Sequence, residues 1–449
     1  MSSEKPNIAV VVLDTLRKDA FDLHFDWLNG TRYENAWSTS HWTPPAHASL
    51  FTGKYGSELG VHGKSKHMDC PESTIPELLQ REGWITRGYS NNVHISHWFN
   101  FDRGFNEFHN DEHGDDLGFN WAEFISNHRH DGPARYLKLL QQVYESDAPT
   151  TPTLNQGVKI KLEDLGIIDG SAKDSGAAET LNWIRRTSWN SSGEFLFINL
   201  MEAHAPYDAP EEYQTVDETT IDGPKATITG SPEADVNHIK KAYDDCVRYL
   251  SDVYKKIYNE LANEFDIIVT VSDHGEAFGE YGGWEHFSGL WPAVTHIPLV
   301  VSTPSGVDEP VETGAPVSLL DVHATVCSYA GINPVDGSRG RSLDSVADRT
   351  THLTETHGLL STTRERLAEE GISETVLDQY DVELRGVADD SGYTFENFDG
   401  GLTDHNGGVD EARNVIEKLA TQVDTRNTED SGFDVPDHVE SRLSDLGYR

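Results

Sequence analysis

The sequence predicts an α/β fold, in which a doubly wound, mainly parallel sheet is sandwiched by helices and a smaller C-terminal α+β domain follows. Short apolar runs recur along the chain, at positions 7–13, 195–201, 266–272 and 297–302. Runs without polar alternation are typical of strands that are buried on both faces of a parallel sheet. Amphipathic segments at 174–187 and 237–264 lie between such runs and predict helices.

Polar residues follow the predicted strands at the point where each strand ends. Asp14 follows the first strand, Asn91 follows a strand at 85–90, and His204 follows the strand at 195–201. Ligands of α/β sheets bind at the carboxyl ends of the strands, so these side chains are candidates for one site. Asp14 is also typical of a helix N-cap, and Asn91 taken alone is more typical of a turn.

A short helix that begins with a hydroxyl group is predicted at 43–52. Pro44 and Pro45 are excluded from a helix interior but suit the first turn, so Thr43 is expected at the helix entrance. Gly53 suits the end of this helix. The Thr43 oxygen and His47, one turn later, would lie at the positive end of the helix, which favours an anionic group. A simple N-cap role for Thr43 is compatible with this interpretation.

A second motif is the pair Asp273-His274, which ends the strand at 266–272 and precedes Gly275. Adjacent carboxylate and imidazole ligands at a sharp turn are suited to a metal ion. A cap followed by a surface histidine is the alternative interpretation.

The composition of the chain limits the classes of molecule that it is expected to bind. The chain has 449 residues and a formal net charge of −41, from 76 acidic and 35 basic residues. Such a surface repels nucleic acids and anionic membranes, and it suggests adaptation to high salt. The three cysteines are scattered, so neither a disulfide framework nor a zinc ribbon is supported. No apolar run is long enough to span a bilayer, so we expect a soluble, cytoplasmic protein.

The chain is expected to divide into two domains. Residues 1–343 would form the catalytic α/β domain, with a mostly helical insertion at about 111–171, where clear strands are lacking. Residues 344–449 are more polar and would form the smaller domain, with a hairpin-like stretch at 382–398.

In chain order, the segments 43–53, 90–92, 202–207 and 272–276 resemble the sulfatase family of the alkaline phosphatase superfamily. The resemblance implies the sandwich fold of that superfamily and hydrolysis of small anionic sulfate, phosphate or phosphonate esters. Two residues depart from the family pattern. Thr43 stands where sulfatases carry the Cys or Ser that becomes formylglycine, and His47 stands where they carry Arg. A Thr nucleophile resembles the phosphodiesterase and phosphonoacetate hydrolase branches instead.

The resemblance and the residues together predict a site. A metal ion would be held by Asp14, Thr43, Asp273 and His274, a mixed oxygen and nitrogen set that suits Mg²⁺ or Mn²⁺ and suits Ca²⁺ less well. Zn²⁺ stays an alternative.

The remaining site residues are given roles in catalysis and in substrate binding. Thr43 would act as the nucleophile and form a covalent intermediate, with His204 as a further catalytic residue. Charge on the substrate oxygens would be stabilised by His47, Lys64 and Asn91. His286, in an aromatic and glycine-rich loop, would donate a proton to the leaving oxygen, unless it is a surface histidine paired with Glu285.

Two alternatives stay open at this point. One is a phosphodiesterase-type hydrolase with two metals, to which His204 and His286 would contribute ligands. The other is a non-catalytic, anion-binding relative.

Overall fold

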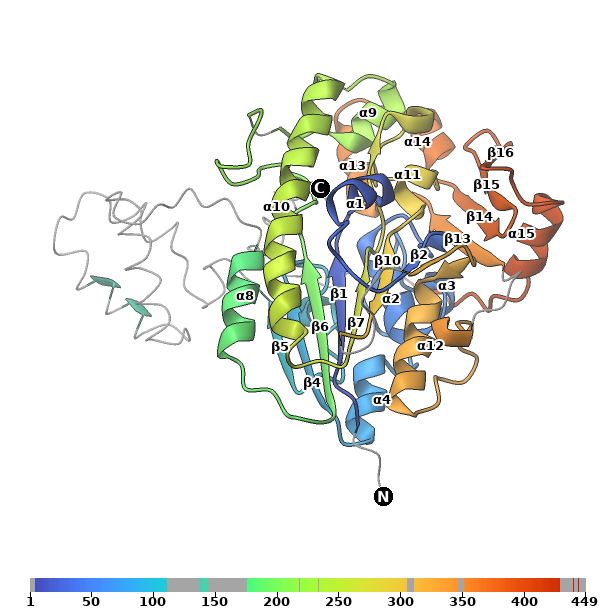
Figure 1. Ribbon diagram of the computed structural model, residues 1–449. Coiled ribbons are helices and arrows are strands. Elements are labelled where there is room, and N and C mark those ends of the chain that lie inside the picture. The colour runs from blue at the N-terminus through green and yellow to red at the C-terminus, as the bar shows by residue number, and fades with distance from the viewer. Residues whose placement is uncertain are drawn as a thin grey trace.

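The computed structural model describes residues 5–110, 138–139, 142–143, 176–217, 219–232, 234–304, 311–345, 351–428, 439 and 443. An eight-stranded sheet forms its centre, with the strand order β11-β2-β10-β7-β1-β6-β4-β5 (Figure 1). The helical insertion expected at 111–171 lies outside the described residues, apart from 138–139 and 142–143.

Five neighbouring strands of this sheet run parallel to one another, which confirms the prediction of a mainly parallel sheet. They are β7 (Ile267–Val271), β1 (Ile8–Leu13), β6 (Glu194–Leu200), β4 (Ile85–Ser90) and β5 (Glu107–Asn110). At the other edge, β10 (Leu299–Ser302) is antiparallel to both of its neighbours, β7 and β2 (Thr31–Tyr33), and β11 (Val311–Thr313) pairs parallel with β2.

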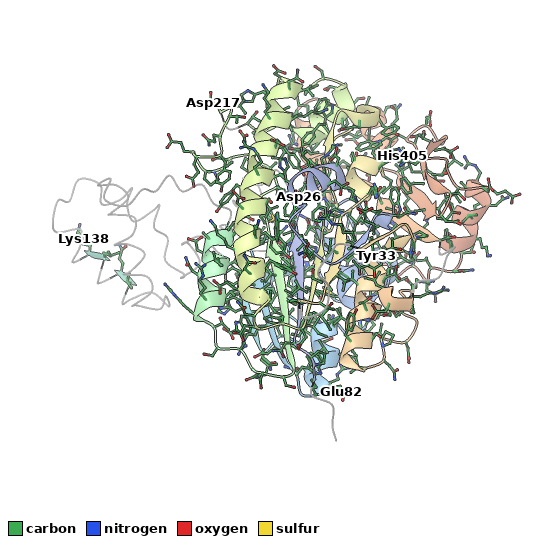
Figure 2. All side chains as sticks on the ribbon, in the orientation of Figure 1. Asp26, Tyr33, Glu82, Lys138, Asp217 and His405 are labelled. Carbon is green, nitrogen blue, oxygen red and sulfur yellow. The ribbon has the colours of Figure 1, made fainter. Side chains whose placement is uncertain are left out.

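Both faces of the sheet carry helices, and the side chains of β1 explain why. Ile8, Val10 and Val12 belong to one apolar cluster with α2 (Thr43–Thr52), α4 (Ile75–Arg81) and α12 (Leu319–Ala330). Ala9 and Val11 belong to a second cluster with α1 (Lys18–His24), α8 (Ala177–Arg186) and α10 (Val236–Leu261). Alternate residues of a strand point to opposite faces, so a strand between two cores must be apolar throughout. Figure 2 shows side chains filling the space between the sheet and its helices.

A second sheet, of four antiparallel strands, is formed by β13 (His352–His357), β14 (Glu383–Asp389), β15 (Gly392–Glu396) and β16 (Leu402–His405). Strands β14 and β15 form the hairpin that was predicted at 382–398. Hydrogen bonds join this sheet to the first part of the chain. The Glu355 amide donates to the Thr39 carbonyl, and the Glu355 carboxylate accepts hydrogen bonds from Ser57. The domain boundary at 343 stays a prediction.

The remaining elements are short, with at most nine residues each. They are β3 (Ala36–Trp37), α3 (Gly56–Leu59), η1 (His97–Phe99), α9 (Gly223–Thr229), β8 (Ala277–Phe278), η2 (Glu280–Gly282), β9 (Trp284–Glu285), α11 (Pro292–Thr295), β12 (Val317–Ser318), η3 (Leu343–Ser345), α13 (Ser361–Glu369), α14 (Glu374–Tyr380) and α15 (Ala412–Ala420).

Among the described residues, no helix combines the length and the hydrophobicity that are needed to cross a bilayer. Adaptation to high salt and a cytoplasmic location stay predictions.

The second sheet contains a partly buried charge cluster around His357. Its two ring nitrogens lie 3.5 Å from Glu355 Oε1 and 3.6 Å from Glu383 Oε1. Burial lowers the pKa of His357, but pairing with the two carboxylates outweighs burial and raises the pKa to about 9. The folded protein favours the protonated form of His357, so protonation of His357 stabilises the fold. This contribution is complete below the unfolded-state pKa of about 6.5.

We therefore expect His357→Gln to lower the free energy of unfolding by about 2–3 kcal/mol at pH 6, because the variant leaves the two carboxylates without their cation. The difference from the wild type should shrink as the pH rises from about 6.5 through 9, where the wild-type imidazolium itself loses its proton. Urea unfolding at pH 6, 8 and 10 measures this difference. A difference of equal size at all three pH values would contradict the charge assignment.

Candidate active site

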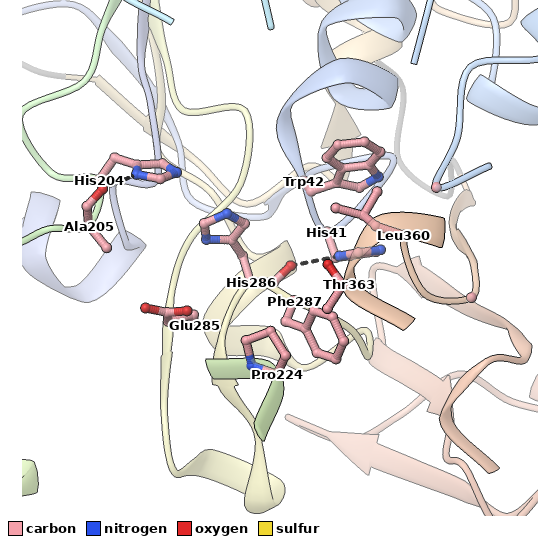
Figure 3. Close-up of a pocket in the computed structure, with 12 residues that line it drawn as sticks. His41, Trp42, His204, Ala205, Pro224, Glu285, His286, Phe287, Leu360 and Thr363 are labelled. Atoms are coloured by element: carbon pink, nitrogen blue, oxygen red, sulfur yellow. Dashed lines mark hydrogen bonds between the residues drawn. The ribbon is translucent and has the colours of Figure 1, made fainter. Parts of the chain in front are cut away.

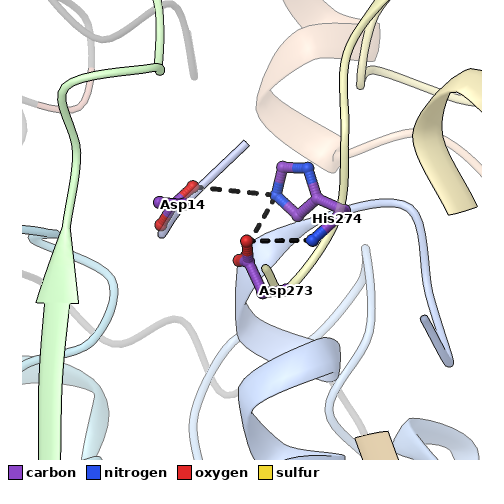
Figure 4. Close-up of side chains that lie close together, drawn as sticks. All are labelled: Asp14, Asp273 and His274. Carbon is purple, nitrogen blue, oxygen red and sulfur yellow. Dashed lines mark hydrogen bonds and ion pairs between the residues drawn. The ribbon is translucent and has the colours of Figure 1, made fainter. Parts of the chain in front are cut away.

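Two neighbouring parallel strands bring three ionisable side chains together. Asp14 follows β1, and Asp273 and His274 follow β7, which pairs directly with β1. One ligand atom from each of the three residues lies within 4.8 Å of the others, and all three side chains are buried (Figure 4). Within the described part of the chain, this is the one group of three or more His, Cys, Asp or Glu residues that is close enough to hold a metal ion.

A fourth side chain, that of Thr43, lies beside this group. Helix α2 begins at Thr43 after an extended Trp42, as the two prolines predicted. The hydroxyl Oγ1 lies 3.2 Å from His274 Nε2, and Thr43 is fully buried. The nucleophile candidate and the three metal-ligand candidates therefore share one small volume at the carboxyl edge of the parallel strands.

The carboxylates of Asp14 and Asp273 differ in the hydrogen bonds that they accept. Asp14 accepts hydrogen bonds from the Thr15 hydroxyl at 2.8 Å and from the side-chain amides of Asn92 and Asn199 at 2.9 and 3.1 Å. Burial raises the pKa of Asp14, but the neighbouring imidazoles, His274 first, outweigh it and lower the pKa to about 2. In contrast, Asp273 Oδ2 accepts no hydrogen bond from any described residue.

This arrangement fits a divalent cation. Burial, and then the charge of Asp14, raise the pKa of Asp273 well above its usual range. His274 Nε2 and His47 Nδ1 lie 3.4 and 3.5 Å from Asp273 Oδ2, but neither ring gives it a hydrogen bond. A buried carboxylate oxygen without a hydrogen bond is costly, and so is a second carboxylate beside it, unless a cation neutralises both. The donors are two carboxylates, one imidazole and one hydroxyl, a set that suits Mg²⁺ or Mn²⁺.

His47 supports the start of α2. Its Nδ1–H donates to the Thr43 carbonyl at 3.0 Å, and its Nε2 accepts from Asn199 at 3.2 Å. Burial lowers the pKa of His47 to about 4, although the Asp14 charge acts in the other direction. The ring is therefore a neutral hydrogen-bonding group that links Thr43 to β6.

Asn92 and Asn199 are site residues that the sequence interpretation did not assign. Asn199 interrupts the apolar run that follows Glu194 in β6, and this single amide was the available signal. Asn92 lies next to Asn91, which was chosen instead. The Asn91 amide donates to Thr180 at 3.4 Å, on helix α8, whereas Asn92 bonds Asp14.

Lys64 forms an ion pair with Asp381, the residue that follows helix α14. Its Nζ bonds Asp381 Oδ1 at 2.6 Å and the Leu359 carbonyl at 2.7 Å. Its predicted role in binding the substrate stays a prediction.

Two further imidazoles stand beside the metal-ligand group. The ring of His286 lies 4.6 Å from that of His274 and 5.0 Å from that of His204, measured between centroids. His286 Nδ1 lies 3.1 Å from Glu276 Oε1, and the Tyr207 hydroxyl donates to the other oxygen of Glu276 at 2.8 Å. Burial holds the pKa of His286 well below its usual range and raises that of Glu276 to about 7.

A hollow of about 520 Å³, part of it open to solvent, adjoins these histidines (Figure 3). Trp42, His204 and His286 are among the residues that line it, and His41 Nδ1 donates to the His286 carbonyl at 2.8 Å. His41 is a further residue that the sequence interpretation did not assign.

The sequence is similar to known proteins over most of its length. A family model described as Sulfatase matches residues 6–332. The uncharacterized sulfatase YidJ of Escherichia coli K12 is 24% identical over 354 residues, which is 71% of this chain and 64% of that protein. Human iduronate 2-sulfatase is 21% identical over 327 residues, which is 63% of this chain and 55% of that protein. The chain thus spans about two thirds or less of the length of these relatives.

Solved structures share the fold at low sequence identity. Phosphonate monoester hydrolase SpPMH from Silicibacter pomeroyi has a TM-score of 0.60 and 18% identity, with 93% of this chain and 94% of that chain covered. The phosphonate monoester hydrolase of Agrobacterium radiobacter has a TM-score of 0.59 and 15% identity, with 99% and 94% covered. The match to residues 6–332 contains Asp14, Thr43 and the Asp273-His274 pair and extends over more than half of the sequence, so the chain belongs to the sulfatase family.

Proposed function

We propose that this chain is a metal-dependent hydrolase that cleaves sulfate, phosphate or phosphonate esters, with Thr43 as the nucleophile. The observation that carries the proposal is the position of the Thr43 hydroxyl, 3.2 Å from His274 Nε2 in a buried group that fits a divalent cation. The names of the relatives, which include sulfatases and phosphonate monoester hydrolases, support the same class of reaction.

The nucleophile needs activation, because a neutral hydroxyl is weakly reactive. A cation held by Asp14, Asp273 and His274 would supply this by favouring the alkoxide. Thr43 Oγ1, after losing its proton to solvent, forms a bond to sulfur or phosphorus while the bond to the leaving oxygen breaks. Water then attacks the threonyl ester, and the Thr43 oxygen leaves. His47 holds Thr43 at the helix start through the Thr43 carbonyl throughout.

In this proposal, His286 handles the proton of the leaving group. The neutral ring passes its Nε2 proton to the departing oxygen while its Nδ1 takes a proton from the Glu276 carboxyl, whose pKa is raised to about 7, and both transfers are reversed when water attacks. Glu276 orients the ring through this contact with Nδ1, at 3.1 Å. Tyr207 fixes the Glu276 carboxyl in turn.

The described residues favour a single metal ion over the two-metal alternative. They contain one metal-ligand group, and neither His204 nor His286 belongs to it. The non-catalytic alternative predicts no turnover at all, so it is separated from the proposal by experiment.

Metal dependence and turnover are tested together. The purified protein is assayed against aryl sulfate, aryl phosphate, phosphonate monoester and phosphate diester substrates, before chelation, after chelation, and after addition of Mg²⁺, Mn²⁺, Ca²⁺ or Zn²⁺. We expect turnover of at least one substrate class, its loss on chelation, and its return with one of the metals. Activity that survives exhaustive chelation would contradict the metal role, and silence across the panel would favour the non-catalytic alternative.

The proton-transfer role of His286 predicts a dependence on the leaving group. His286→Ala should lower kcat by about 10²–10⁴-fold for alkyl esters, whose alkoxides need a proton, and much less for nitrophenyl esters. His97→Ala, an exposed histidine on η1, is the matched control and should change neither rate. Equal losses on both classes of ester would mean that His286 binds the anion or a metal instead.

A further inference from the structure

The turn that joins β1 to α1 contacts both carboxylates of the metal-ligand group. The Thr15 hydroxyl donates to Asp14 Oδ1 at 2.8 Å, and the Thr15 backbone amide donates to Asp273 Oδ1 at 3.3 Å. The two carboxylates follow different strands and lie side by side in the site (Figure 4). Thr15 therefore links them through two hydrogen bonds from one residue.

The backbone of Thr15 has an uncommon conformation. Its φ is 62°, in the left-handed region that a β-branched residue rarely adopts, because its side chain crowds the backbone there. A return to negative φ would rotate the amide relative to the side chain and break one of the two bonds to the carboxylates. Strained conformations of this kind persist only where the surrounding structure fixes them.

Tyr243, on helix α10, is the residue that fixes this turn. Its hydroxyl donates to the Thr15 carbonyl at 3.1 Å and accepts the Arg17 backbone amide at 2.9 Å. One side-chain oxygen thus bonds both ends of the turn 15–17. Thr15 is fully buried and Tyr243 is 4% exposed, so solvent has little access to these bonds.

The ring of Tyr243 is held independently of its hydroxyl. It packs edge-on against the rings of Tyr207 and Phe278, with centroids 5.6 and 5.0 Å away. Edge-to-face pairs of this kind are favourable and orient the rings. Removal of the hydroxyl alone would therefore leave the ring in its place and release only the turn.

We propose that Tyr243 is a positioning residue of the metal site, which acts through Thr15 to hold the carboxylates of Asp14 and Asp273 in the arrangement that binds the ion. The inference rests on the proposed function for the presence of the metal ion. Groups that orient metal ligands typically change metal affinity by about 10–100-fold. The turn orders both carboxylates when the chain folds, so this ordering does not oppose metal binding.

Binding of Mn²⁺ to the chelator-treated protein tests this role without any turnover. The EPR signal of the free ion gives the Kd. Tyr243→Phe keeps the ring and removes the hydroxyl, and it should raise the Kd by about 10–100-fold. Thr15→Val keeps the branched shape without the hydroxyl and should raise the Kd in the same way. Thr15→Ser restores the hydroxyl and should bind Mn²⁺ as the wild type does.

Tyr393→Phe is the matched control for the loss of a buried hydroxyl. Tyr393 lies in β15 of the second sheet, is fully buried, and also donates to a backbone carbonyl, that of Leu290 at 2.9 Å. Its variant should lose stability in urea unfolding, as Tyr243→Phe does, and should keep the wild-type Kd for Mn²⁺. Far-UV circular dichroism of each variant confirms that the fold is retained.

The inference is overturned by an unchanged Kd in a folded Tyr243→Phe or Thr15→Val, or by an equal rise in Tyr393→Phe. If the wild type binds Mn²⁺ and shows metal-dependent turnover, either result leaves the proposed function standing. A wild type that binds no Mn²⁺ would also overturn the inference, and the assays with Mg²⁺, Ca²⁺ and Zn²⁺ then decide the proposed function separately.

Discussion

Replacement of Thr43 by Ala is expected to lower kcat by at least about 10³-fold while the fold and the bound metal are retained. The variant removes the one oxygen that the proposed reaction uses to attack sulfur or phosphorus. The side chain is fully buried and its hydroxyl contacts His274 Nε2, so the loss of stability should be limited to about 1 kcal/mol for one hydrogen bond. Steady-state kinetics, metal analysis and thermal unfolding measure the three quantities separately.

Thr43→Ser is the matched control, because it restores the hydroxyl without the methyl group. It should recover most of the lost rate. Mass spectrometry of protein quenched during turnover should find an ester on the peptide that contains Thr43 in the wild type, and none in Thr43→Ala. Near-full activity of Thr43→Ala would remove Thr43 from the nucleophile role, whatever the metal content.

The second large effect is expected at Asp273. Asp273→Asn should lower activity by at least about 10³-fold and abolish the response of thermal stability to added metal. The wild-type protein should gain about 2.7 kcal/mol at a metal concentration 100 times Kd, because the ion binds the folded state alone. The reason lies in Asp273 Oδ2, a buried oxygen that accepts no hydrogen bond from the described residues and is available to a cation.

Asp321→Asn is a suitable control for this experiment. Asp321 is equally buried, but its oxygens accept the backbone amides of Ser318 and Arg341 at 2.8 and 2.7 Å, away from the metal-ligand group. Its variant should lose stability and still respond to metal. A metal-dependent shift in melting temperature that persists in Asp273→Asn would show that the ion binds elsewhere.

The strands and the helix entrance could be predicted because each depends on local chemistry. A run such as 8–13 is apolar throughout since both faces are covered, and Pro44 and Pro45 dictate where α2 begins. The order of the strands in the sheet depends on contacts between distant segments. The antiparallel direction of β10 is one example, since the run 297–302 looks the same in either direction.

The hydrogen-bond and ion-pair partners of the site residues were harder to predict than the charged residues themselves. Asn199 was missed because a single amide in an apolar strand is a weak signal, although it bonds both Asp14 and His47. The ion pair of Lys64 could not be foreseen, because its carboxylate partner, Asp381, lies far along the chain. The roles of Asn91 and Lys64 in substrate binding stay predictions.

The central position of β1 has a consequence for synthesis of the chain. Ile8 pairs with Phe195 on one side and with Ile267 on the other, so both neighbours of β1 are made long after it. At translation rates of about 5–20 residues per second, the first partner follows after about 10–40 s. During this interval an apolar strand with two unpaired edges is exposed, which favours association with other chains or with chaperones. The metal-ligand group forms later still, when β7 places Asp273 and His274 beside Asp14, so a ribosome-bound chain that stops before residue 273 should not yet bind the ion.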